Sequence, residues 1–192
     1  MDHKKLYIIG GCNGAGKTTA SFNMLPDILD CKEYVNADEI ARGISPFQPE
    51  KVSFEAGRIM LQRIKDLITS DEDFAFETTL ATKSFKGVIE KAREKGYYVC
   101  LIYIWLESTQ LAEMRVQARV EEGGHNIPLE IIERRYYRGL NNLFKLYHDL
   151  CDLLLIYDNS TSIPELVYEK SGSDGVQIYN GDKFRQIKPQ VL

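Results

Sequence analysis

No stretch of this sequence is apolar for the length of a membrane span, and there is no excess of basic residues. A helix needs about 20 largely apolar residues to cross a bilayer, so we expect no membrane partner. The formal net charge is −4, so no overall positive field attracts nucleic acid or an anionic membrane surface. The N-terminus enters a predicted strand without the apolar segment of a signal peptide, and a cytoplasmic protein is therefore expected.

Cysteine and histidine are scarce and scattered. The four cysteines, Cys12, Cys31, Cys100 and Cys151, stand far apart and form no C-x-x-C pair. This spacing excludes the common zinc motifs and favours small buried thiols in a reducing compartment, with Cys12 a minor candidate for an oxidisable thiol. One histidine gives no metal site, so we expect His125 to be a hydrogen-bonding residue of the lid rather than a general base.

A glycine-rich loop between an apolar strand and a helix is the most informative feature of the sequence. Residues 11–18 read GCNGAGKT and match the pattern G-x-x-x-x-G-K-[ST]. The glycines let the backbone curl until several N–H groups converge on phosphate oxygens, and the positive end of the following helix adds attraction. Lys17 is expected to reach the β- and γ-phosphates, and the Thr18 hydroxyl to ligate Mg²⁺. The predicted nucleotide-binding residues are Gly11, Cys12, Asn13, Gly14, Ala15, Gly16, Lys17, Thr18 and Thr19.

Short apolar segments alternate with amphipathic ones along the rest of the chain. Strands are predicted at 5–10, 33–36, 74–77, 97–106 and 153–157, and helices at 18–25, 50–70, 83–95, 108–122 and 128–151. The alternation predicts one α/β domain, 1–192, with the three-layer P-loop NTPase fold of the nucleotide-kinase type around a five-stranded parallel sheet. A helical lid is expected at about 108–140, and a C-terminal β-hairpin is expected at about 164–180, either at the edge of the main sheet or outside it.

Two carboxylates follow predicted strands. Ligands of such sheets bind at the carboxyl ends of the strands, so Asp38, Glu77 and the glycine-rich loop should share one crevice. Asp38 is expected to accept the proton of an acceptor hydroxyl, and its alternative role is to cap the helix that would begin at Glu39. Glu77 fits a metal-side or substrate-side carboxylate, or a charge that meets solvent. Thr78 and Thr79 add hydroxyls suited to a polar acceptor such as a sugar.

Arginines gather on two predicted helices that a Gly-Gly loop joins. Arg115 and Arg119 are four residues apart and share one helix face, as do Arg134 and Arg138, with Arg135 beside them. Two such helices form a hinged lid whose arginines stabilise charge on a transferred phosphoryl group. The alternative is that these arginines pair with neighbouring glutamates on solvated helix faces.

Taken together, these motifs resemble the zeta-toxin-like P-loop kinases, in particular short bacterial members related to the toxins of epsilon–zeta toxin–antitoxin pairs. The resemblance covers about residues 4–160 and rests on segments 11–19, 36–39, 76–79, 119–128 and 134–138. It implies a kinase that uses ATP or GTP with Mg²⁺, with Asp38 as the base and Glu77 against the acceptor. It also implies that Arg119 and Arg134 or Arg135 act on the phosphates, and it allows an antitoxin protein as a partner.

The leading hypothesis is a kinase that moves the γ-phosphate onto a small-molecule hydroxyl. Better-known members phosphorylate UDP-N-acetylglucosamine, but this chain is shorter, has Glu-Thr-Thr at 77–79 where they tend to have Glu-Gly-Thr, and has Asn-Ala before Asp38. These departures bear on the acceptor more than on the reaction. The alternatives are a nucleotide-controlled binding module with slow hydrolysis and a nucleoside or nucleotide kinase. The residues assigned to catalysis are Asp38, Lys17, Arg119 and Arg134, and those assigned to the acceptor are Glu77, Thr78, Thr79 and Arg135.

Overall fold

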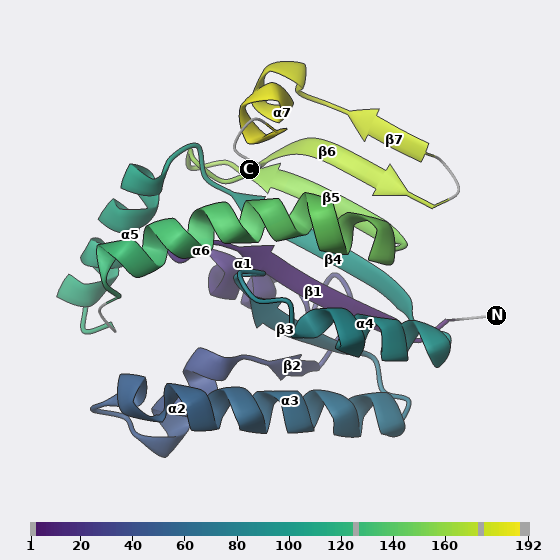
Figure 1. Ribbon diagram of the computed structural model, residues 1–192, viewed down its shortest axis with the longest axis horizontal. Helices are drawn as coiled ribbons and strands as arrows, with labels where there is room; N and C mark the ends of the chain where they lie inside the picture. The colour runs from purple at the N-terminus through teal and green to yellow at the C-terminus, as the bar shows by residue number, and fades with distance from the viewer. Residues whose placement is uncertain (1–2, 125–126, 173–174, 189–192) are drawn as a thin grey trace.

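The computed structural model describes residues 3–124, 127–172 and 175–188. Within them, a seven-stranded sheet has the order β2-β3-β1-β4-β5-β6-β7, and helices pack on both of its faces (Figure 1). The first five strands in the chain are parallel to one another, whereas β6 pairs antiparallel with β5 and β7 pairs antiparallel with β6. The strands are β1 (Lys5–Gly11), β2 (Glu33–Val35), β3 (Phe74–Thr78), β4 (Tyr98–Trp105), β5 (Leu153–Asp158), β6 (Glu165–Ser171) and β7 (Gly175–Ile178).

The predicted α/β fold of the P-loop type is confirmed, with one difference in the sheet. The five parallel strands are present, and the C-terminal hairpin lies at the edge of the sheet, which is one of the two positions expected for it. Its first strand, β6, pairs antiparallel with β5 and so extends the sheet to seven strands. His125 lies outside the described residues, so its predicted hydrogen bond stays a prediction.

The most apolar segments form the centre of the sheet. In β1 and β4 almost every side chain is buried, including Leu6, Ile8 and Leu101, because helices cover both faces of these strands. Because β1 lies between β3 and β4, its carboxyl end and the glycine-rich loop that follows are flanked on both sides by the carboxyl ends of other strands.

The described part of the chain contains seven α-helices. They are α1 (Lys17–Met24), α2 (Ala37–Ile44), α3 (Ser53–Thr69), α4 (Phe85–Glu94), α5 (Thr109–Glu121), α6 (Leu129–Asn142) and α7 (Gly181–Ile187). The helix predicted for 128–151 is α6 followed by a π-helical turn, Leu143–Tyr147, and a 3-10 turn, His148–Leu150. None of the described helices is long and apolar enough to cross a membrane.

The short helix α7 is an element that the sequence pattern does not predict. Asn180 caps it by accepting the backbone N–H of Lys183 at 3.0 Å. The ring of Phe184 stacks on Tyr168 of β6, with centroids 4.9 Å apart, and Ile187 is fully buried. Tertiary contacts, rather than periodicity, therefore define this helix.

Candidate active site

The loop between β1 and α1 has the backbone geometry of a phosphate-binding turn. Gly11, Gly14 and Gly16 have φ values of 144°, 79° and 90°, a region that L side chains rarely adopt. A Cβ on Gly11 or Gly14 would also meet a backbone carbonyl oxygen at 2.4 or 2.6 Å. Since α1 begins directly after this loop, at Lys17, the loop opens at the positive end of a helix.

Lys17 and Thr18, the two residues predicted to hold phosphates and Mg²⁺, both contact Glu77. The Nζ of Lys17 donates to the Cys12 carbonyl at 2.9 Å and lies 3.6 Å from Oε1 of Glu77. The Thr18 hydroxyl donates to the other carboxylate oxygen at 2.9 Å. Both side chains are almost fully buried, where an unpaired charge would be costly, and each charge compensates the other. Burial raises the pKa of Cys12 to about 11, which favours the protonated and less reactive thiol.

Two further side chains hold Glu77, and sequence reasoning did not identify them. The Tyr34 hydroxyl donates to Oε2 of Glu77 at 2.6 Å, and the Asn36 amide donates to the same oxygen at 3.1 Å. Burial and the Glu77 carboxylate raise the pKa of Tyr34, so its phenol stays a proton donor. Tyr34 lies in β2, and Asn36 is the first residue after this strand. The rule that ligands bind at strand ends points to this region, but it does not predict that these side chains contact Glu77 of the neighbouring strand β3.

Asp38 lies in the first turn of α2, and the helix is capped by a different residue. The side-chain oxygen of Asn36 accepts the backbone N–H groups of Asp38 at 2.8 Å and Glu39 at 3.4 Å. The alternative interpretation of Asp38 as the cap is therefore wrong. Asp38 instead lines three cavities.

These cavities meet around Asp38 and contain most of the predicted site. A cavity of about 170 Å³ covers the glycine-rich loop and is lined by Gly14, Gly16, Lys17, Thr18, Arg115 and Arg119, among others. A second, of about 480 Å³, lies between α3 and the segment after β3 and is lined by Phe54, Gly57, Arg58, Glu77, Thr79 and Thr82, among others. A third, of about 380 Å³, separates α2 from the lid helices. The structure thus brings Asp38, Glu77 and Lys17 together, as predicted.

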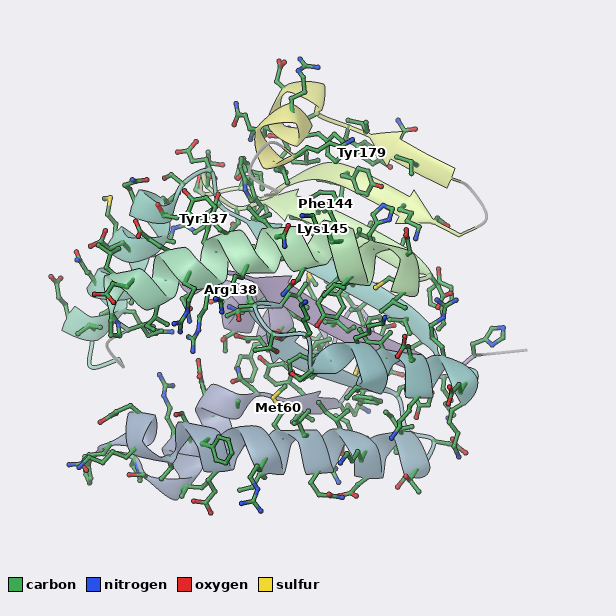
Figure 2. All side chains as sticks on the ribbon, viewed as in Figure 1. Met60, Tyr137, Arg138, Phe144, Lys145 and Tyr179 are labelled. Atoms are coloured by element: carbon green, nitrogen blue, oxygen red, sulfur yellow. The ribbon has the colours of Figure 1, made fainter. Side chains whose placement is uncertain are left out.

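The lid arginines face the same crevice. Arg119, Arg134 and Arg135 all line the cavity between α2 and the lid, and Arg135 also reaches the larger one. Arg135 donates to the Asn13 side chain of the glycine-rich loop at 3.2 Å. Burial lowers the pKa of Arg135, and the nearby Asp38 carboxylate acts in the opposite direction. Figure 2 shows nitrogen-bearing side chains that project from α6 toward α2 and α3.

Thr78 and Thr79 line the larger cavity, and their hydroxyls also shape the turn behind it. Thr78 accepts the backbone N–H of Leu80 at 3.0 Å, and Thr79 accepts that of Ala81 at 3.4 Å. Leu80 has a φ of 56°, which is unfavourable for a residue with a side chain, and the two hydroxyl hydrogen bonds help to stabilise this turn. Their contact with an acceptor stays a prediction.

Asn159 is a contact of the glycine-rich loop that the sequence analysis missed. Its side-chain nitrogen donates to the Ala15 carbonyl at 2.8 Å, while Arg115 donates to the carbonyl of Ser160 at 3.3 Å. Asn159 directly follows β5, so the rule that points to Asp38 and Glu77 could also have found it.

The donor set near Thr18 suits Mg²⁺. Its hydroxyl and the Glu77 carboxylate are hard oxygen ligands, and they lie next to the loop that would hold the phosphates. In the described residues, no cluster of three His, Cys, Asp or Glu side chains could hold a metal ion by itself. Mg²⁺ that is bound mainly through nucleotide phosphates needs only one or two protein ligands, so the residues present fit this ion.

A glycine-rich phosphate loop at the centre of a parallel sheet, under an arginine-bearing helical lid, defines the P-loop kinase class. The family model described as Zeta toxin matches residues 1–183. The chain belongs to the zeta toxin family. It is 34% identical over 144 residues to an uncharacterized protein of Haemophilus influenzae, a match that covers 71% of this chain and 100% of that protein.

Two solved structures share this fold at low sequence identity. A chain of the AvrRxo1-ORF1:-ORF2 complex crystallised with ATP has a TM-score of 0.79 and 15% identity, over 99% of this chain and 65% of its own length. The chain described here is thus about two thirds as long as that neighbour. A chain of the PezAT toxin–antitoxin system of Streptococcus pneumoniae has a TM-score of 0.69 and 16% identity, over 99% of this chain and 85% of its own.

Proposed function

We propose that this protein transfers the γ-phosphate of ATP or GTP to a hydroxyl group of a small molecule. The observation that carries the proposal is the position of Asp38, which lines both the cavity over the glycine-rich loop and the larger cavity beside it. A base for phosphoryl transfer must stand between the donor phosphate and the acceptor hydroxyl. Asp38 is at that junction, and it does not cap its helix.

On the donor side, the loop amides and Lys17 bind the phosphates. Thr18, with Glu77 beside it, would hold Mg²⁺, which neutralises charge on the β- and γ-phosphates when it is bound. Arg119 lines the cavity over the glycine-rich loop, and Arg134 lines the adjoining cavity between α2 and the lid. In this proposal both stabilise the charge that develops on the transferred group. In this proposal, Lys17 exchanges part of its interaction with Glu77 for the phosphates.

On the acceptor side, the larger cavity offers hydroxyl and aromatic groups together with the cations of Lys17, Arg58 and Arg135. Thr79, Thr82 and Ser84 line one wall, and Phe54 and Arg58 line the α3 side. In the reaction, the acceptor oxygen attacks phosphorus, and its proton passes to the carboxylate of Asp38. Glu77 and Arg135 also line this cavity and are assigned to acceptor binding. UDP-N-acetylglucosamine, the acceptor implied by the family resemblance, is the first compound to test.

The proposal extends to a partner and a compartment. The PezAT neighbour is described as a toxin–antitoxin system, and on that ground we include an antitoxin protein among the partners of this chain. We place the reaction in the cytoplasm, where nucleoside triphosphates are supplied.

The decisive experiment incubates the protein with γ-labelled ATP and a metabolite extract and identifies the labelled product by mass spectrometry. Asp38→Asn should lower the rate of product formation by about 10²- to 10⁴-fold, because the base is lost, while nucleotide binding is retained. Asp27→Asn, a change at an exposed carboxylate of the same type, is the matched control. Wild-type turnover in Asp38→Asn would exclude Asp38 as the base. ATP binding with no labelled metabolite would favour the nucleotide-controlled binding module instead.

A further inference from the structure

Asp158 is a buried carboxylate that the proposed chemistry does not use. It ends β5 and is only 3% exposed. One of its oxygens accepts the backbone N–H of Ser160 at 2.9 Å and also the Ser160 hydroxyl. The other oxygen forms an ion pair with Lys183 of α7. Burial alone would raise the pKa of Asp158, but the hydrogen bonds from Lys183 and Ser160 hold it below its usual range.

The segment after Asp158 touches two walls of the cavity over the glycine-rich loop. Asn159 donates to the Ala15 carbonyl at 2.8 Å, and a Cβ added to Gly16 would lie 2.8 Å from the Asn159 side-chain nitrogen. The next carbonyl, that of Ser160, accepts a hydrogen bond from Arg115 at 3.3 Å. Gly16 and Arg115 both line the cavity of about 170 Å³. The position of residues 158–160 therefore affects the shape of the nucleotide site on two sides.

Lys183 is held in place by the packing of its own helix. The Asn180 cap, the stack of Phe184 on Tyr168 and the buried Ile187 fix α7 against β6, and Figure 1 shows α7 beside β6, near the end of β5. A second carboxylate, Glu165 of β6, accepts from Lys183 at 2.8 Å. The ammonium group thus reaches Asp158 from a fixed support.

We propose that Lys183 is a positioning residue for the nucleotide: through Asp158 it fixes residues 158–160, which support the glycine-rich loop and Arg115. This inference rests on the proposed function, because the nucleotide is the proposed ligand of that loop. A buried carboxylate that loses its cation is strongly destabilised. Without Lys183, Asp158 therefore turns toward water, and the hydrogen bonds of Asn159 and Ser160 shift with it.

The test is the affinity for a non-hydrolysable ATP analogue, AMP-PNP with Mg²⁺, measured by isothermal titration calorimetry. Lys183→Met should weaken binding by between about threefold and thirtyfold, and Lys183→Arg, which keeps the charge, should restore most of it. Arg185→Met changes an exposed cation of the same helix and should leave the affinity unchanged. Wild-type affinity in Lys183→Met would overturn the inference. Failure of the wild-type protein to bind AMP-PNP would instead overturn the proposed function.

Two further variants separate positioning from simple loss of folding. Adding Asp158→Asn to Lys183→Met removes the unpaired charge and keeps an oxygen for Ser160, so it should recover most of the affinity. If the double variant binds as weakly as Lys183→Met, α7 acts by packing alone and the inference is wrong. Asn159→Ala breaks the link to the glycine-rich loop without disturbing the buried pair and should weaken AMP-PNP binding by a similar factor. An unchanged affinity in Asn159→Ala would overturn the inference even if Lys183→Met did not fold.

Discussion

Four side chains converge on the carboxylate of Glu77, and they divide into two pairs. Lys17 and Thr18 begin α1, directly after the glycine-rich loop, whereas Tyr34 and Asn36 come from β2 and the residue after it. The first pair is expected to turn to phosphate and Mg²⁺ when a nucleotide binds. The second pair has no such role, so it can keep Glu77 in place while the other contacts change.

Tyr34→Phe tests this division at the scale of one hydroxyl group. It removes a 2.6 Å hydrogen bond to a buried carboxylate, a loss that should lower the free energy of unfolding by about 1.5–3 kcal/mol. Because Glu77 lines the acceptor cavity, turnover should fall more than AMP-PNP affinity. Urea unfolding and the labelled-ATP assay measure the two effects.

The matched control for Tyr34→Phe is Tyr179→Phe. Tyr179 donates to Glu169 at 2.8 Å at the exposed edge of the sheet, far from the crevice (Figure 2). Its removal should change stability by less than about 0.5 kcal/mol and leave turnover intact. Equal effects of the two substitutions would show that Tyr34 has no special role beside Glu77.

At the scale of elements, the sequence predicts the helices, strands and loops whose residue pattern is contained within the element itself. The glycine-rich loop, the central apolar strands and the amphipathic helices all carry their pattern within themselves. By contrast, α7 is seven residues long and depends on the contact of Phe184 with Tyr168. Asn36 and Asp38 are both good helix caps, and only the backbone shows that α2 starts at Ala37 and is capped by Asn36.

Gly57 lies inside α3 and lines the proposed acceptor cavity. Nothing lies within 4 Å of the position that a Cβ on Gly57 would take, so packing does not require a glycine there. Glycine in a helix interior costs about 0.5–1 kcal/mol relative to alanine. Gly57 lines the cavity of about 480 Å³ opposite Glu77 and Thr79, and we interpret its small size as room for the acceptor.

Gly57→Leu should therefore move stability and activity in opposite directions. A better helix former should raise the free energy of unfolding by about 0.5–1 kcal/mol, while the new side chain enters the cavity and lowers turnover by about tenfold or more. Gly87→Leu is the control, because Gly87 lies in α4 with equally open space and does not line that cavity. Urea unfolding and product formation are measured for both variants. If Gly57→Leu keeps full turnover, the acceptor does not lie against α3.

At the scale of the whole molecule, the crevice was predictable and its contacts were not. The crevice follows from the rule that parallel strands present their carboxyl ends at one edge, which needs no knowledge of strand register. The hydrogen bonds that close it join residues far apart in the chain: Arg135 with Asn13, 122 positions away, and Asn159 with Ala15, 144 positions away. Such pairs depend on strand order and helix packing, which the sequence alone did not fix here.

Because the crevice draws on β1, β3, α2, α3 and the lid helices, its ligand should stabilise the molecule as a unit. A nucleotide that binds only the folded chain adds about 2.7 kcal/mol at a concentration 100 times its dissociation constant. For a chain of this length, that gain corresponds to a rise in melting temperature of about 5–10 °C. Thermal unfolding with saturating AMP-PNP and Mg²⁺ measures it directly.

Changes to the ligand or to the loop that reduce this rise in melting temperature identify which part of the nucleotide is bound. Lys17 and Thr18 are assigned to the β- and γ-phosphates and Mg²⁺, so AMP, which lacks those phosphates, should produce only a small part of the rise in melting temperature. Chelation of Mg²⁺ should reduce the rise with AMP-PNP, and Lys17→Ala should nearly abolish it. An equal rise with AMP would mean that the base and ribose dominate binding. In that case the glycine-rich loop would not be the main contact, and phosphoryl transfer from this site would lose its physical basis.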